Sequence, residues 1–139
     1  MTNEQKERVR LLVKELRTTT AGQVRRSLRG FAEDAAGESE KEVAGYCCLG
    51  IACNVFQQEN GGKWNGTYFF PTDEDRSNCQ HGYLPDSVRD WFGFELSDPV
   101  IRIDHDEYGD EPCTASQIND EYGATFAEIA DLFEAMYLK

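Results

Sequence analysis

Apolar residues recur at helical spacing near both ends of the chain. Near the start, the apolar stripe consists of Val9, Leu12, Val13 and Leu16. Near the end, a longer apolar face consists of Phe126, Ile129, Ala130, Phe133, Met136 and Tyr137. Each stripe follows a possible capping box, Thr2 with Gln5 and Thr125 with Glu128, which satisfies free N–H groups at a helix start. The pattern therefore predicts a helix over residues 3–17 and another from residue 125 onward.

The middle of the chain predicts further elements. Residues 45–59 are mostly apolar and predict a helix with Leu49, Ala52, Cys53 and Phe56 on one face. Gly50 lies inside this segment, where glycine is unfavourable in a helix, so we expect it to permit close packing of another element. Residues 63–70 predict a hairpin around Asn65-Gly66, a pair that suits a tight two-residue turn. Residues 84–92 predict a short helix that ends at Gly93.

The remaining segments have weaker patterns. Residues 23–31 fit either a short strand or a helical turn, and residues 100–103 fit a short strand. Residues 32–44 predict a mobile loop, and residues 104–111 predict an acidic, solvated loop. With 139 residues, we expect one α+β domain spanning 1–139, with three to four helices packed on a small antiparallel sheet or hairpin.

Charge is unevenly divided along the chain, whose net charge is −12. Residues 1–69 carry ten basic and nine acidic side chains, whereas residues 70–139 carry four basic and seventeen acidic side chains. The acidic half argues against direct binding of duplex DNA, which requires neutralisation of phosphates. Arg25, Arg26 and Arg29 lie in a segment without acids, and guanidinium groups bind phosphate well. Both regions also fit simple solvated surfaces.

The five cysteines do not form a metal-binding pattern. Cys47, Cys48 and Cys53 lie in the most apolar segment, where free cysteine behaves as a small hydrophobe. The odd number of cysteines and the absence of a signal-peptide pattern favour reduced thiols in a cytoplasm. No apolar run reaches the length of a membrane span. We therefore expect a cytoplasmic protein with no metal, no cofactor and no membrane partner.

Three motifs occur together in a fixed order. They are Gly45–Cys53 (GYCCLGIAC), Leu84–Gly93 (LPDSVRDWFG) and Ile118–Ala130 (INDEYGATFAEIA). This order resembles a group of small accessory proteins encoded by tailed bacteriophages and prophages. The resemblance implies a phage origin, action in the host bacterial cytoplasm and a role outside virion building. Such proteins commonly interfere with host defence.

Two functions fit the resemblance and the residues, and neither requires catalytic residues. The first is sequestration of a nucleotide-derived immune signal, in which arginines bind phosphate and aromatic rings stack on a base. The candidate ligand-binding residues for this function are Arg25, Arg26, Arg29, Trp64, Tyr68, Asn119 and Asp120. Packing does not require an Asn-Asp pair, and a turn that binds backbone groups accounts for Asn119 and Asp120 more simply than a pocket does.

The alternative is an acidic protein-binding inhibitor or DNA mimic that blocks a host defence protein or a nucleic-acid enzyme. An enzyme that degrades the immune signal is a third possibility, but no catalytic motif supports it. A closed ligand pocket is difficult to build within 139 residues. We therefore expect a homo-oligomer that shares the site between copies.

Overall fold

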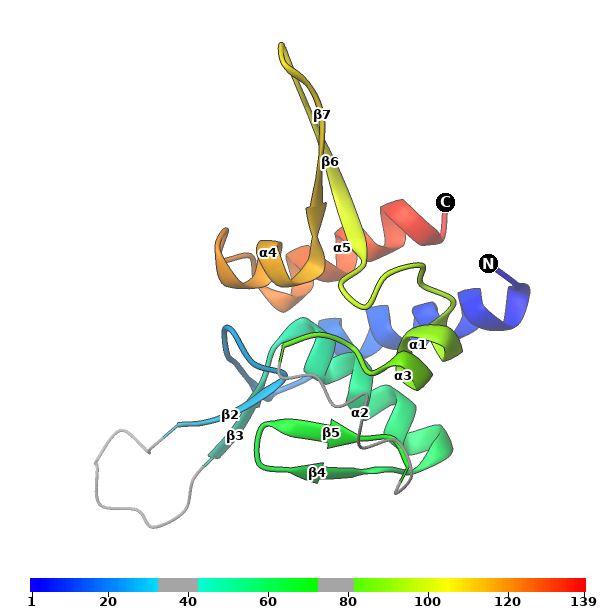
Figure 1. The fold of residues 1–139 in the computed structure, drawn as a ribbon, viewed down its shortest axis with the longest axis vertical. Helices are drawn as coiled ribbons and strands as arrows, with labels where there is room; N and C mark the ends of the chain where they lie inside the picture. Colours follow the sequence, from blue (N-terminus) through cyan, green and yellow to red (C-terminus); the bar gives the residue numbers. More distant parts are fainter. Residues whose placement is uncertain (33–42, 73–81) are drawn as a thin grey trace.

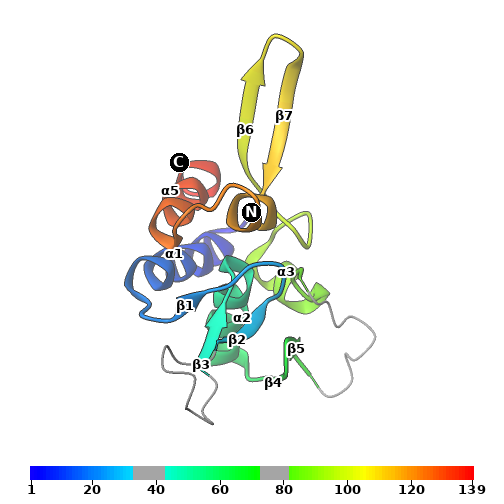
Figure 2. The ribbon, with the colours of Figure 1, turned by 90° about the vertical axis from the view of Figure 1, so that its left-hand side faces the viewer.

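A computed structural model describes residues 1–32, 43–72 and 82–139 (Figure 1). Helix α1 (Asn3–Thr18) begins at Thr2, whose side chain forms the predicted capping box with Gln5. Helix α5 (Phe126–Tyr137) begins at Thr125 with the same arrangement. The two terminal helices pack side by side (Figures 1 and 2), which brings both ends of the chain to one side of the molecule.

A small sheet joins α1 to the centre of the fold. Strands β1 (Gly22–Gln23), β2 (Arg29–Ala32) and β3 (Val43–Tyr46) lie in the order β1-β3-β2, with β1 parallel and β2 antiparallel to β3. The segment 23–31 thus contributes to two strands. Most of the predicted loop 32–44 lies outside the described residues, but its ends belong to β2 and β3, so those two boundaries were wrong.

Helix α2 (Cys48–Asn60) is the central element of the core. Most of its first nine residues are buried, and the expected apolar face lies within the core. The helix starts later than predicted because Gly45 and Tyr46 belong to β3 and Cys47 is the N-cap. Gly50 has the expected role: an added Cβ would lie 1.9 Å from the carbonyl oxygen of Leu28.

Two shorter predictions are confirmed. Strands β4 (Lys63–Asn65) and β5 (Tyr68–Phe70) form the expected antiparallel hairpin. Asn65 pairs with Tyr68, so the two turn residues are Gly66 and Thr67 and not the predicted Asn65 and Gly66. Gly66 has a φ of 60°. Helix α3 (Asp86–Phe92) ends at Gly93 in the left-handed conformation.

The segment 104–111 is a hairpin and not the acidic loop that the sequence predicted. Strand β6 (Val100–Asp106) pairs antiparallel with β7 (Gly109–Thr114), and helix α4 (Ala115–Asp120) follows directly. This hairpin projects away from the rest of the molecule in both views (Figures 1 and 2). Acidic residues have a low strand propensity, which explains the wrong prediction.

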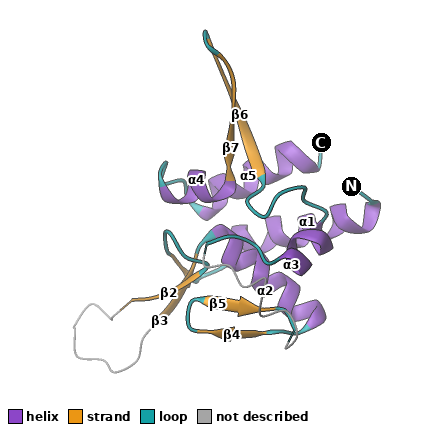
Figure 3. Cartoon of the chain, in the orientation of Figure 1, coloured by secondary structure: helices purple, strands orange, loops and turns teal. Residues whose placement is uncertain are grey.

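Five helices and three small sheets make up the described part of the chain (Figure 3). The architecture is α+β, as predicted, and one apolar core connects its elements. The core includes the predicted residues Val9, Leu12, Leu49, Ile129 and Phe133, all fully buried. None of the described helices combines the length and apolar character needed to cross a bilayer.

Candidate functional site

The most prominent surface feature is the hairpin arm, defined here as residues 100–114. It carries five carboxylates and only one arginine. The carboxylates belong to Asp104, Asp106, Glu107, Asp110 and Glu111. Because the arm extends beyond the body of the molecule (Figure 2), it presents a line of negative charge that another molecule can approach from several sides.

The base of the arm is held firmly to the body. The hydroxyl of Tyr137 donates a hydrogen bond of 2.6 Å to the carbonyl oxygen of Val100. Burial raises the pKa of Tyr137 to about 12, so this hydroxyl stays protonated and remains a donor at neutral pH. On the other side, Ser116 donates its backbone N–H to a carboxylate oxygen of Asp98 at 2.9 Å. The arm is therefore fixed at its base and exposed at its tip.

The strand register divides the arm into two faces. Asp104 lies opposite Glu111, and residues that face each other across a ladder share one face. Asp106 also lies on this face, because side chains alternate along a strand. We call Asp104, Asp106 and Glu111 the acidic face. The opposite face carries Ile103, paired with Pro112, and His105, paired with Asp110.

Ionic contacts stabilise the acidic face near its base. The Arg102 Nε lies 2.8 Å from Oδ1 of Asp104, and hydrogen bonding to this guanidinium lowers the pKa of Asp104. The same guanidinium stacks over the ring of Tyr122, 5.0 Å from its centroid. Burial, followed by the hydrogen bond to Asp104, raises the pKa of Cys113. Within one chain, Asp104 therefore contacts both Arg102 and Cys113.

The tip of the arm is ordered but exposed. Tyr108 donates its backbone N–H to Asp106 at 2.8 Å, which closes the turn. Nδ1 of His105 lies 2.6 Å from Oδ1 of Asp110, across the ladder. The side chain of Tyr108 is 91% exposed. Sequence reasoning did not identify Ile103 or Tyr108 as surface residues of interest, and the turn residues Glu107 and Tyr108 do not form one of the dipeptides typical of hairpin turns.

Two of the three candidate arginines, Arg25 and Arg26, lie on the connection between β1 and β2, and Arg29 is the first residue of β2. Arg25 and Arg26 are exposed, and Arg26 has a left-handed φ of 69°. Arg25 lies against the turn before α5, with Nη2 3.1 Å from the position of a Cβ built on Gly123. Arg29 is half-buried on β2, and its guanidinium lies 5.6 Å from the ring centroid of Trp64. The arginines therefore lie next to two different parts of the fold.

The candidate aromatic residues belong to the β4–β5 hairpin. Trp64 is half-buried and donates its indole N–H to Asn54 at 2.8 Å. Its ring also contacts Tyr46, at a centroid distance of 5.5 Å. Tyr68 is 40% exposed on the neighbouring strand. The structure thus brings Arg29 and Trp64 together, with the indole held in place by its own hydrogen bond.

Asn119 of α4 is buried and forms hydrogen bonds to β1, to the residue after β1 and to the start of α2. Its side chain is 1% exposed and accepts a hydrogen bond from Gln23 at 2.8 Å. Its amide group donates to the backbone carbonyl of Val24 at 2.9 Å and to Asp120 at 2.8 Å. Its oxygen also accepts the backbone N–H of Cys48 at 3.3 Å. These contacts match the backbone-binding interpretation of Asn119, while Asp120 is half-exposed beside it.

The apolar-segment cysteines are buried, as predicted. Cys47, Cys48 and Cys53 are at most 3% exposed. Desolvation raises the pKa of Cys47 to about 12 and also raises those of Cys48 and Cys53. Such thiols remain protonated, which makes them poor nucleophiles. Among the residues that the structure describes, no three His, Cys, Asp or Glu side chains gather to hold a metal ion.

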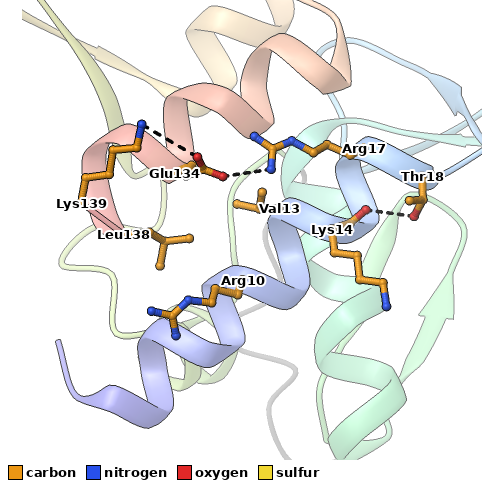
Figure 4. A pocket seen from close by; sticks show the side chains of 8 residues that line it. All are labelled: Arg10, Val13, Lys14, Arg17, Thr18, Glu134, Leu138 and Lys139. Atoms are coloured by element: carbon orange, nitrogen blue, oxygen red, sulfur yellow. Dashed lines mark hydrogen bonds and ion pairs between the residues drawn. The ribbon is translucent and has the colours of Figure 1, made fainter.

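Three surface grooves are lined by described residues, with volumes of about 460, 420 and 410 Å³. None of these three is lined by any of the seven candidate ligand residues. The first is a basic groove between α1 and α5 (Figure 4). Three of its four basic side chains already face carboxylates, for example Arg17 with Glu134 at 2.9 Å, so this groove is a packing seam between the two helices.

The third of these grooves lies at the base of the arm. It has a volume of about 410 Å³. Its lining is mostly apolar and includes Met1, Leu96, Val100, Ile103, Met136 and Tyr137. We call it the basal groove. Met1, Leu96 and Ile103 are each at least 43% exposed, which is unusual for three large apolar side chains in one place.

One sequence family covers most of this architecture. Residues 27–137 match the family described as a domain of unknown function, DUF8296. The chain belongs to this family. The DUF8296 match includes every element from β2 to α5, and therefore the whole hairpin arm, whereas Arg25 and Arg26 precede it. Neither a curated protein nor a solved structure matches the chain.

Proposed function

We propose that this protein is an acidic binding protein whose hairpin arm occupies a basic surface of a nucleic-acid-binding protein. The observation that carries the proposal is the projection of five carboxylates on an arm that is fixed at its base. A fixed arm loses little conformational freedom on binding, which favours affinity. Opposite charge on the partner steers the encounter and excludes acidic competitors.

The biological setting belongs to the same proposal. The resemblance to phage accessory proteins suggests that the partner is a host defence protein or a host nucleic-acid enzyme in the bacterial cytoplasm. An acidic ribbon competes with the phosphates of a nucleic acid for the same Lys and Arg side chains. The protein would then act as an inhibitor without chemistry of its own.

The test compares capture by the wild type with capture by a neutralised arm. The variant Asp106→Asn/Asp110→Asn/Glu111→Gln removes three exposed charges, and Asn at 106 retains an acceptor for the N–H of Tyr108. We expect wild-type protein immobilised in a bacterial lysate to retain proteins that duplex DNA or 0.5 M salt displaces. The neutralised variant should lose them.

A matched control neutralises three carboxylates elsewhere on the surface. Glu4, Glu7 and Glu59 are exposed residues that line one of the other grooves. The triple Glu→Gln variant at these positions carries the same change in net charge and should capture the same proteins as the wild type. Equal capture by all three proteins, or capture that duplex DNA does not displace, contradicts the proposal.

Sequestration of a nucleotide-derived signal is the second candidate, favoured by the contact between Arg29 and Trp64 and by the exposure of Arg25 and Arg26 on the connection that precedes β2. Calorimetry against cyclic dinucleotides and ADP-ribose tests it. We expect a Kd below about 10 μM for the correct ligand and loss of binding in Arg25→Glu/Arg26→Glu. Lys14→Glu, on the exposed surface of α1, is the control. Absence of binding to every ligand of this panel eliminates the candidate.

A further inference from the structure

The edge of β6 that faces away from β7 has no strand partner among the described strands, and helix α5 contacts β6 with Tyr137 bonded to Val100 at its base. Strands β6 and β7 form a separate two-stranded sheet, so neither strand has a second neighbour among the described strands. An open strand edge is a template for a further strand. We propose that β6 pairs antiparallel with β6 of a second copy, which joins the two arms into a four-stranded sheet across a twofold axis.

The sequence of β6 is complementary to itself. It reads VIRIDHD over residues 100–106, and its central residue is Ile103. Antiparallel pairing about Ile103 places Arg102 of each copy opposite Asp104 of the other copy. Opposite charges facing each other across strands are stabilising. A twofold interface requires this kind of self-complementarity, whereas centring the pair on Arg102 or Asp104 would place like charges together.

The same register brings the tip of one arm to the basal groove of the other copy. With Ile103 on the axis, Tyr108 of one copy lies level with Asp98 of the other. Asp98 precedes Pro99 and Val100, which line the basal groove. Tyr108, 91% exposed in the single chain, would thus cover an apolar groove of about 410 Å³. Pairing would also bury Ile103, which is 43% exposed.

An irregularity in the strand supports this geometry. The register shifts between Val100 and Arg102, and a bulge of this kind redirects side chains. Val100 and Ile103 consequently both line the basal groove, although strict alternation would place them on opposite faces. Tyr137, hydrogen-bonded to Val100, forms part of the groove lining and fixes it relative to β6.

Pairing of this kind leaves the acidic face open. Residues that face each other across a ladder share a face, so Arg102 and Asp104 of both copies lie on the same side of the joined sheet. The acidic faces of the two arms then form one doubled surface. The inference therefore does not depend on the proposed function, and its test measures mass and cross-linking without any partner protein.

The first experiment is sedimentation equilibrium in 0.3 M NaCl, which screens the repulsion between two copies of net charge −12. We expect the wild type to approach twice 15.8 kDa. Arg102→Asp and Asp104→Arg each place like charges together across the axis and should each weaken dimerisation about tenfold or more.

Mixing the two variants shows whether they lose dimerisation through repulsion between the two copies or through a charge change within each copy. A copy with two acids at 102 and 104 is complementary to a copy with two arginines there, so an equimolar mixture should restore the dimer. Repulsion within each chain is unchanged by mixing. A monomeric wild type, or a mixture that stays as monomeric as its components, overturns the proposal.

Cross-linking gives a second measurement in case a charge variant folds poorly. Two Ile103→Cys side chains meet at the axis with Cβ atoms about 5 Å apart, close to disulfide range. Copper phenanthroline with oxygen should oxidise them rapidly to a linked dimer. Tyr108→Cys is the control, because it is more exposed but lies far from the axis. Equal rates of linkage for the two variants also overturn the proposal.

Discussion

Asn119 shows how a single buried polar side chain can connect distant segments. Its amide contacts β1 through Gln23, the residue after β1 through Val24, and the start of α2 through Cys48. A buried amide is tolerated only when its hydrogen bonds are made. Gln23, Val24 and Cys48 each lie more than seventy positions away from Asn119 in sequence, so Asn119 fixes α4 against the centre of the fold.

Replacement of Asn119 should therefore destabilise the protein. Asn119→Ala leaves the N–H of Cys48 and the carbonyl of Val24 without these partners, and we expect a loss of about 1–3 kcal/mol in the free energy of unfolding. Urea unfolding followed by circular dichroism measures it. Glu121→Ala, two residues later and exposed, should cost less than about 0.5 kcal/mol. A neutral Asn119→Ala would mean that the amide is not needed for folding.

At the level of helices and strands, the sequence predicted an element correctly where residues close together in the chain carry a strong signal for it. The capping boxes at Thr2 and Thr125 and the β4–β5 hairpin with its turn glycine Gly66 each depend on residues close in sequence. The hairpin arm was missed because its pairs are acidic and depend on register, as in His105 with Asp110. Helix α4 was missed because it has only six residues, too few to show a period.

The candidate site was only partly predictable for the same reason. The sequence placed Arg29 and Trp64 in one candidate set, and the structure brings them into contact. It could not show that Asn119 is surrounded by backbone groups, because those groups come from β1 and α2. The sequence also could not show that Met1, Leu96 and Met136, which are far apart along the chain, line one groove.

The contact between α2 and the start of β2 gives a prediction at this scale. An added Cβ at Gly50 would meet the carbonyl oxygen of Leu28 at 1.9 Å, and backbone cannot move aside as a side chain can. Gly50→Ala should therefore lower the free energy of unfolding by about 1–3 kcal/mol or more. Gly22→Ala is the matched control, since nothing lies within 4 Å of its added Cβ. Equal unfolding midpoints for the two variants would contradict this view of the packing.

At the scale of the whole molecule, the acidic side chains lie on the surface and three of the cysteine thiols lie in the core. The net charge of −12 is concentrated in the second half of the sequence, and its most exposed part is the arm. The core instead holds Cys47, the N-cap of α2, together with Cys48 and Cys53 of the helix. These two features respond to different conditions. Salt screens the surface charges, whereas alkaline pH lowers the free energy of unfolding because the buried thiols ionise only in the unfolded chain.

The core thiols predict that stability falls at high pH. An unfolded thiol ionises near pH 9, whereas burial raises the pKa of folded Cys47 to about 12. The stabilising difference is therefore fully present below pH 9 and is lost as pH rises toward 12. Above pH 9 the unfolded chain binds fewer protons than the folded chain, so each such thiol lowers the free energy of unfolding by about 1.4 kcal/mol per pH unit.

Urea unfolding at pH 8, 9.5 and 10.5 with a reductant measures this slope. Cys47→Ala removes one ionisable thiol and should flatten the decline, even though the variant itself is less stable at pH 8. Ionisation of Tyr and Lys side chains and repulsion at −12 contribute equally to both proteins and cancel in the comparison. The same slope in wild type and variant would show that Cys47 ionises alike in both states, and would place this thiol outside the core.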